Sequence, residues 1–195
     1  MIQSTMATVG GVVATNTGTL TQAVLKNAST TLSIAKERPG TVQFYFGGLV
    51  AQNSGSGSIS YSYVDTNTII SRSAPMSTPN RVYIAGLVGE SSNSNITSCY
   101  VHNIITKPDV EIGSIYVFIA NLTTANYGSG TACFYNAGQS QDPVGGSAYG
   151  NFTAIESYAQ IPSGTALNNG ESYFTTAQES SFPTLRWESE FIKLW

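Results

Sequence analysis

Apolar and polar residues alternate in short stretches along most of the chain. The alternation is clear at 59–63, where Ile59, Tyr61 and Tyr63 are separated by serines. It recurs at 96–100, in Ile96, Ser98 and Tyr100. A period of two is expected for β-strands that bury one face. Around the first of these stretches the pattern predicts strands at 42–52 and 57–65 and a weaker one at 68–74, with a turn of Asn, Ser and Gly between the first two. The pattern therefore predicts an all-β fold of short strands.

A longer pattern repeats over these strands. Each copy has small residues, a Gly-Leu-Val triplet or a variant of it, a polar turn and a strand that ends in an aromatic residue. Four copies lie near 10–25, 47–64, 85–101 and 120–136. Repeats of about 20–50 residues built from short strands are typical of β-solenoids and β-propellers. Propeller blades need four strands each. With two or three strands expected in each unit, we predict a parallel β-solenoid of about four rungs, and the general chirality of parallel crossovers predicts a right-handed one.

The two clearest triplets are predicted to be structural corners. They are Gly48, Leu49 and Val50 in one unit and Gly86, Leu87 and Val88 in the next. Glycine permits a turn or a close approach, leucine enters the core, and valine closes the strand. Stacked rungs bring equivalent residues to about 4.8 Å from one another. The spacing then predicts one column of Ser62, Cys99 and Cys133 beside an aromatic column of Tyr63, Tyr100 and Phe134.

These motifs resemble the GLUG-motif family of bacterial surface proteins. Family copies read Gly-Gly-Leu-Val-Gly, then Asn-x-Gly, then an Ile-x-x-Ser-Tyr strand. Segments 47–63 and 85–100 match this pattern, with Ala51 where glycine is usual and residues 90–92 in place of Asn-x-Gly. Segment 175–188 resembles the Pro-x-Leu-x-Trp closing strand of such domains. The resemblance implies a β-solenoid module at the cell surface or in a secreted protein.

The end of the chain differs in composition from the repeats. Residues 151–195 hold more charge and finish in large apolar residues such as Trp187, Phe191 and Trp195. An open solenoid exposes unpaired strand edges at its last rung unless they are covered. We therefore predict a repeat region at 1–150 and a C-terminal capping segment at 151–195. The start shows no equivalent cap, so we expect the remainder of a longer chain, or a docking partner, at the N-terminal end.

Composition narrows the classes of function. Charged residues make up 10% of the chain, against about 25% in ordinary domains. The net charge is −3, and the eight Lys and Arg residues are scattered, whereas nucleic-acid binding needs clustered positive charge. No stretch reaches the roughly 18 apolar residues of a membrane span. The start lacks the charged and apolar regions of a secretory signal. We expect neither a nucleic-acid partner nor a membrane span.

The residues that usually carry chemistry are few. Cys99 and Cys133 do not make a disulfide framework or a zinc site, so we expect both to be buried as small apolar side chains. His102 is the only histidine, and its register places it beside Asp65 in the neighbouring unit. That is a pair on the surface and not a catalytic constellation. The sequence predicts no enzyme, no cofactor and no metal site.

Tyrosines are the better candidates for binding. Tyrosine supplies rigid contact area and a hydroxyl group at low entropic cost. We predict a non-enzymatic extracellular module with an adhesion or spacer role, which binds glycan or a host protein through Tyr61, Tyr63, Tyr83 and Tyr100. Which of them face outward depends on register, because a slip of one residue reverses every side chain.

Two alternatives remain open. A carbohydrate-active β-helix enzyme would need a cleft lined by two or more carboxylates and a basic residue. A phage or fimbrial structural component would be favoured by a trimeric assembly.

Overall fold

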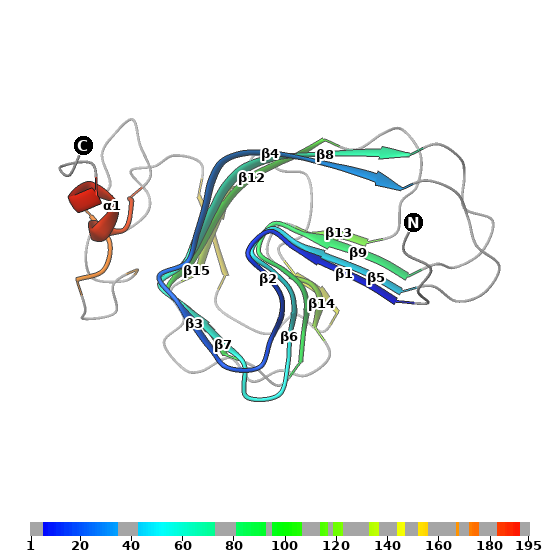
Figure 1. Cartoon of the computed structure of the whole chain (residues 1–195), viewed down its shortest axis with the longest axis horizontal. Coiled ribbons are helices and arrows are strands. Elements are labelled where there is room, and N and C mark those ends of the chain that lie inside the picture. Colours follow the sequence, from blue (N-terminus) through cyan, green and yellow to red (C-terminus); the bar gives the residue numbers. More distant parts are fainter. Residues whose placement is uncertain are drawn as a thin grey trace.

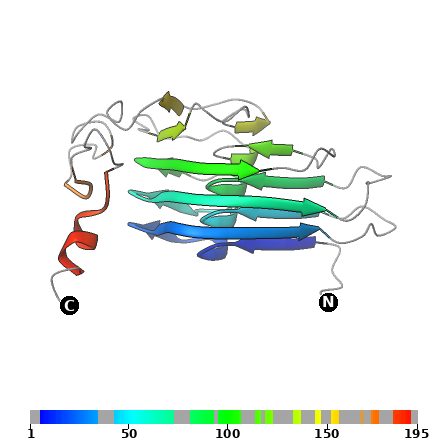
Figure 2. The same ribbon diagram turned by 90° about the horizontal axis from the view of Figure 1, so that it is seen from above.

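The chain forms a parallel β-solenoid, in which successive turns of the backbone stack into rungs (Figures 1 and 2). The computed structural model describes residues 6–34, 43–72, 81–92, 95–106, 114–116, 119–122, 133–136, 144–146, 152–155, 167, 172–175 and 183–191. Every pairing between the named strands is parallel and joins a rung to the next one. The predicted fold, an all-β solenoid of about four rungs, is confirmed.

Each of the first three rungs has four strands. Rung 1 contains β1 (Met6–Gly10), β2 (Val13–Asn16), β3 (Thr19–Thr21) and β4 (Val24–Ile34). Rung 2 contains β5 (Gln43–Gly47), β6 (Val50–Asn53), β7 (Ser58–Ser60) and β8 (Tyr63–Arg72). Rung 3 contains β9 (Arg81–Ala85), β10 (Val88–Ser91), β11 (Asn95–Thr97) and β12 (Cys99–Thr106).

The described part of rung 4 contains β13 (Ser114–Tyr116), β14 (Ile119–Leu122) and β15 (Cys133–Asn136). Beyond it, β16 (Val144–Gly146) pairs with β14, and β17 (Phe152–Ile155) pairs with β15. Stacking therefore continues past position 150, where the sequence placed the end of the repeat region. The helix α1 (Arg186–Phe191) follows near the end of the chain.

The strands line up as four sheets. Sheet A has the order β1-β5-β9-β13, sheet B β16-β14-β10-β6-β2, sheet C β11-β7-β3 and sheet D β17-β15-β12-β8-β4. In sheet D, Tyr100 is aligned with Tyr63 on one side and with Phe134 on the other. Cys99 is aligned with Cys133. The rung register predicted from the repeat spacing is confirmed.

The prediction of two or three strands in each unit was wrong, because a corner divides each of the two longer predicted strands. The predicted strand 42–52 is split into β5 and β6, and the predicted strand 57–65 is split into β7 and β8. The predicted third strand at 68–74 overlaps the end of β8, which runs on to position 72. At the second of these corners local periodicity gives no signal, because residues 57–65 keep the same alternation on either side of it.

The first corner is the Gly-Leu-Val triplet, and it joins sheet A to sheet B. A Cβ atom added to Gly48 would lie 2.0 Å from the carbonyl oxygen of Gly86 in the next rung, so no side chain fits there. The N–H group of Leu49 donates to the carbonyl oxygen of Leu87 (3.0 Å), and both leucines are fully buried. Val50 begins β6, whereas the sequence placed it at the end of a strand.

The second corner joins sheet C to sheet D and has no sequence marker. Gln22, Tyr61 and Ser98 occupy it in the first three rungs, with φ angles of 54°, 48° and 52°. This left-handed backbone is uncommon for residues other than glycine, asparagine and aspartate. The chain turns at this corner without the residue types that usually permit the turn.

An inner core fills the space enclosed by sheets B, C and D. Its buried residues come from all three sheets and from the corners: Leu49, Val50, Ile59, Val64, Leu87, Val88, Ile96, Cys99, Val101 and Cys133. Rung 1 contributes partly buried residues to the same core, among them Val13, Leu20 and Leu25. At the turn between sheets B and C, the amide of Asn16 donates to the side-chain oxygen of Asn53 (2.8 Å), which ties rung 1 to rung 2 inside the protein.

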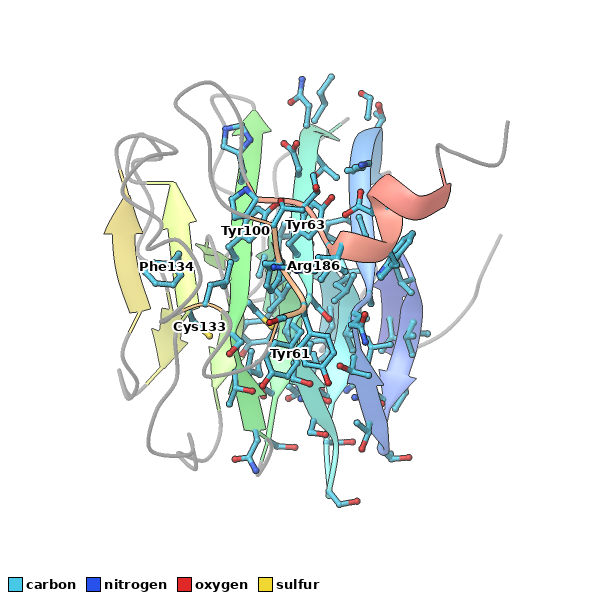
Figure 3. All side chains as sticks on the ribbon, turned by 90° about the vertical axis from the view of Figure 1, so that its left-hand side faces the viewer. Tyr61, Tyr63, Tyr100, Cys133, Phe134 and Arg186 are labelled. Atoms are coloured by element: carbon cyan, nitrogen blue, oxygen red, sulfur yellow. The ribbon has the colours of Figure 1, made fainter. Side chains whose placement is uncertain are left out.

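A second, outer core lies on the other face of sheet D (Figure 3). It consists of Tyr63, Tyr100 and Phe134 from the sheet and Leu167, Phe174 and Leu185 from the C-terminal part of the chain. We call residues 183–191 the strap. The strap runs along the flank of the rungs, where it contacts β12 through Tyr100, β8 through Tyr63 and β4 through Lys26 (Figures 1 and 2). Its described residues cover a lateral face of the solenoid. The predicted cap at 151–195 over the edge of the last rung falls mostly outside the described residues and stays a prediction.

Candidate binding surfaces

The aromatic column of sheet D is an interior feature. The rings of Tyr63 and Tyr100 stack with centroids 4.6 Å apart and planes 9° from parallel. Phe174 packs at a tilt against both rings, with centroid distances of 6.4 and 6.0 Å. Both tyrosines are only 1% exposed. Their rings leave sheet D on the side away from the inner core, because neighbouring side chains of a strand point to opposite faces and Val64 belongs to the inner core.

Both phenol groups bind the strap. The hydroxyl group of Tyr100 donates to the carbonyl oxygen of Pro183 (2.7 Å). The hydroxyl group of Tyr63 donates to the carboxylate of Glu188 (2.8 and 2.9 Å). Burial raises the pKa of both phenols well above the ordinary value, and the carboxylate of Glu188 raises the pKa of Tyr63 further. Both side chains therefore remain neutral donors at physiological pH.

Glu188 is the residue that fixes the strap. Its side chain is buried, and besides Tyr63 it accepts from the ammonium group of Lys26 and from the N–H group of Leu185 (2.8 Å). Leu185 directly precedes α1, so Glu188 caps the first turn of the helix in the manner of a capping box. One carboxylate therefore holds the helix start, rung 1 and rung 2 together.

The four tyrosines predicted to bind ligands do not form one surface. The strap and Phe174 cover Tyr63 and Tyr100, so while the strap is in place neither ring has a free face. Tyr61 is half-buried at the corner between sheets C and D, where its ring packs on Tyr173 with centroids 4.3 Å apart (Figure 3).

Tyr83 lies apart from the other three, in sheet A. Its ring is half-buried and stacks on Tyr45 with centroids 5.2 Å apart. Ligand binding through Tyr61 and through Tyr83 stays a prediction, and the two residues belong to different sheets.

A polar column lies beside the aromatic one on the outer face of sheet D. The imidazole Nδ1 of His102 lies 2.7 Å from a carboxylate oxygen of Asp65, and both side chains are partly exposed. The predicted contact between Asp65 and His102 is confirmed. Lys26 is aligned with Asp65 in the neighbouring strand, so a basic, an acidic and a second basic residue follow one another across three rungs.

Sheet C has an outer face that sequence reasoning missed. Leu20, Ile59 and Ile96 point into the inner core, and the residues between them form two polar columns: Thr19, Ser58 and Asn95, and Thr21, Ser60 and Thr97. Hydroxyl groups bond across the rungs, Ser58 to Thr19 (3.4 Å) and Ser60 to Thr21 (3.2 Å). The alternation Thr-Leu-Thr, Ser-Ile-Ser and Asn-Ile-Thr is the signal that could have revealed this face.

The cysteines are free and buried, as predicted. Burial raises the pKa of the Cys133 thiol to about 12 and that of Cys99 well above its usual value. Both thiols are therefore poor nucleophiles in the folded protein.

The described ranges contain no group of three or more His, Cys, Asp or Glu side chains placed to hold a metal ion. In the same part of the chain, no helix combines the length and the apolar character that crossing a membrane requires.

Comparison of the chain with models of protein families, with curated proteins and with solved structures gave no match. The solenoid fold is therefore established by the strand pairing alone. The resemblance of segments 47–63 and 85–100 to the GLUG-motif family stays a prediction.

Proposed function

We propose that the chain is a non-enzymatic repeat module of a bacterial surface or secreted protein, where it serves as a rigid spacer that also presents a surface for a glycan or a host protein. The spacer role is supported by the stacked rungs and by two cores that each connect several rungs. The resemblance to GLUG-motif proteins supports the location at the cell surface.

The observation that carries the binding role is the half-buried Tyr61–Tyr173 pair next to the hydroxyl columns of sheet C. Tyr61 directly follows Ser60, whose hydroxyl group bonds to Thr21. Aromatic rings provide rigid, amphipathic contact area, and the neighbouring hydroxyl groups can donate and accept hydrogen bonds. A sugar ring, which has apolar C–H faces and hydroxyl edges, fits this combination.

A glycan array probed with the full chain tests the binding role. We expect binding to at least one glycan, and about tenfold weaker binding by the Tyr61→Asn variant, which corresponds to about 1.4 kcal/mol. Asparagine is chosen because it tolerates the left-handed backbone at this corner.

The matched control is Tyr83→Asn, which changes the tyrosine of sheet A and should leave binding unchanged. If Tyr83→Asn weakens binding and Tyr61→Asn does not, the surface lies on sheet A instead. If no glycan binds, the glycan part of the proposal is wrong, and a host protein or the spacer role alone is left.

One observation favours a second candidate, a carbohydrate-active enzyme. The Asp65–His102 pair, with Lys26 in register, could exchange protons with a substrate. Incubation with a panel of polysaccharides, followed by measurement of new reducing ends, tests this activity. Turnover that is lost in Asp65→Asn would replace the spacer proposal, whereas an absence of turnover in the unaltered chain rejects the enzyme.

A further inference from the structure

Rung 1 has the residue pattern of an interior rung but lies at an open edge of the described structure. Val9 is aligned with Phe46 of rung 2, and Val12 precedes β2 just as Leu49 precedes β6. Phe46 and Leu49 are buried, whereas Val9 and Val12 are 40% and 46% exposed. Solenoid ends that face water need a polar outer surface. The apolar columns of the inner rungs instead continue to this edge.

The backbone hydrogen bonds at the Gly-Leu-Val corner all run in one direction, which shows which backbone groups face the open edge. The N–H group of Gly11 donates to the carbonyl oxygen of Gly48 (3.1 Å), and that of Val12 donates to the carbonyl oxygen of Leu49 (3.1 Å). In this corner each rung therefore donates to the following rung and presents its carbonyl groups to the preceding one. By the same repeat, the carbonyl groups of Gly11 and Val12 face out of the open edge.

At two other places in the rung the direction is reversed. The N–H groups of Ser54 and Tyr63 in rung 2 donate to carbonyl groups of rung 1, each at 3.0 Å. The equivalent N–H groups in rung 1 are those of Thr17 and Val24, which therefore face the open edge. A partner must offer donors at the Gly-Leu-Val corner and acceptors at these two places, which is the arrangement of another rung of the same type.

The glycine column restricts that partner further. A Cβ atom on Gly11 would lie 2.1 Å from the carbonyl oxygen of Gly48, and one on Gly48 would lie 2.0 Å from that of Gly86. In each case the carbonyl group of the following rung occupies the space of a side chain. A rung placed before rung 1 would meet the carbonyl group of Gly11 in the same way, so it needs glycine at this position.

We propose that the open edge of rung 1 is a docking surface for another β-solenoid rung, a polypeptide segment with glycine in register with Gly11 and a large apolar residue in register with Val12. The docked rung continues the existing interface between rungs 1 and 2, and it buries Val9 and Val12 as that interface buries Phe46 and Leu49. This inference rests on the proposed role as an extended repeat module and names the chemistry of its partner.

An inserted rung tests the proposal in the full chain. A second copy of residues 43–80 is placed directly before Met6, which brings the copy of Gly48 into register with Gly11. We expect amide hydrogen exchange at Thr17 and Val24 to slow by about tenfold or more, because both N–H groups gain acceptors. The matched control carries valine in place of the inserted glycine, and its exchange at these two amides should equal that of the unaltered chain.

A second insertion uses a copy of residues 81–113, which has its own Gly-Leu-Val triplet. It tests the proposal independently if the inserted copy of residues 43–80 does not fold. The proposal is overturned if both insertions leave exchange at Thr17 and Val24 unchanged, or if the valine control slows exchange as much as its parent. Glycan binding is measured on a different face, so a negative glycan array does not alter this result. Failure of the inserted rungs likewise leaves the glycan proposal standing.

Discussion

At the scale of single residues, the corner between sheets C and D is the least expected feature. Gln22, Tyr61 and Ser98 share a left-handed backbone there, at a cost of about 1–2 kcal/mol for each residue. Ser98 also has a buried hydroxyl group that has no hydrogen-bond partner within the described part of the chain. The parallel sheets on either side force this conformation, because all three rungs must turn at the same level to keep their pairing.

Replacing Gln22 with glycine should therefore stabilise the protein. Glycine adopts the left-handed backbone without strain but loses more entropy on folding, so we expect a net gain of about 0.5–1 kcal/mol in the free energy of unfolding. Urea denaturation measures it. The matched control is Thr21→Gly in the adjacent extended strand, which should lower stability by about 1 kcal/mol. A loss of stability in Gln22→Gly would show that the corner is not strained.

The two corners differ in whether their residues allow the corner to be predicted from the sequence. The Gly-Leu-Val corner could be predicted, because a carbonyl group of the next rung fills the space beside Gly48 and only glycine fits there. The corner at Tyr61 could not, because no glycine or asparagine occupies it and the alternation of residues 57–65 continues through it. Its position depends on the pairing of whole rungs.

At the scale of elements, the strap and sheet D act as one unit. The strap contributes one short helix, and Glu188 connects that helix to Tyr63 and Lys26. A buried carboxylate is favourable only while its hydrogen-bond donors are present. The stability of this unit should therefore depend on a few polar contacts as well as on the outer core.

Replacing Glu188 with alanine should release the strap. The buried Tyr63 hydroxyl group and the N–H group of Leu185 lose their acceptor, and we expect a loss of about 2–3 kcal/mol. Limited proteolysis should then cut within 183–191 while rungs 1 to 3 stay protected. The control is Lys26→Arg, which keeps a cationic donor beside the buried carboxylate and should change the free energy of unfolding by less than about 1 kcal/mol. Equal protection of the strap in Glu188→Ala and the unaltered chain would contradict this role.

The buried phenols should make the protein sensitive to alkali. Because folding raises the pKa of Tyr63 and Tyr100, the neutral forms stabilise the fold below the unfolded value of about 10, and this contribution is lost as the pH rises above it. Denaturant unfolding between pH 8 and 11.5 should show the decline. The Tyr63→Phe/Tyr100→Phe double variant should decline less steeply, since it loses two of the groups that titrate. Parallel curves for the two proteins would argue against the burial of these phenols.

The place of the strap illustrates a limit of sequence reasoning about elements. Large apolar residues in the tail predicted that it packs on the solenoid, but the open edge of the last rung and the flank of sheet D were equally compatible with that pattern. The outward direction of Tyr63 and Tyr100 gives the flank an apolar surface, on which Phe174 and Leu185 pack. That direction depends on the exact register of the strand, because a shift of one residue moves every side chain to the other face of the sheet.

At the scale of the whole molecule, stability is distributed along the stack, because each rung contacts mainly its neighbours. A residue of an inner rung has partners on both sides, whereas a residue of rung 1 has described partners on one side only. The difference appears in equivalent positions, since Leu49 and Leu87 are fully buried and Val12 is 46% exposed.

Truncation of equivalent side chains should cost more stability in the inner rungs than in rung 1. We expect Leu49→Ala and Leu87→Ala to cost about 2–5 kcal/mol each, and Val12→Ala to cost less than about 1 kcal/mol because half of its side chain already faces water. Thermal and urea unfolding of the three variants measure the costs. If Val12→Ala cost as much as Leu49→Ala, another part of the protein would have to cover the edge of rung 1.

The sequence by itself determined the repeat, its length and its register. Backbone pairing between parallel strands forces equivalent residues into columns, so equal spacing in the chain becomes alignment in space, as with Tyr63, Tyr100 and Phe134. Tertiary structure alone decided the second corner, the outward face of the aromatic column and the place of the strap. Each of these depends on which face of a strand meets which distant segment, and a pattern with a period of two fits either face equally well.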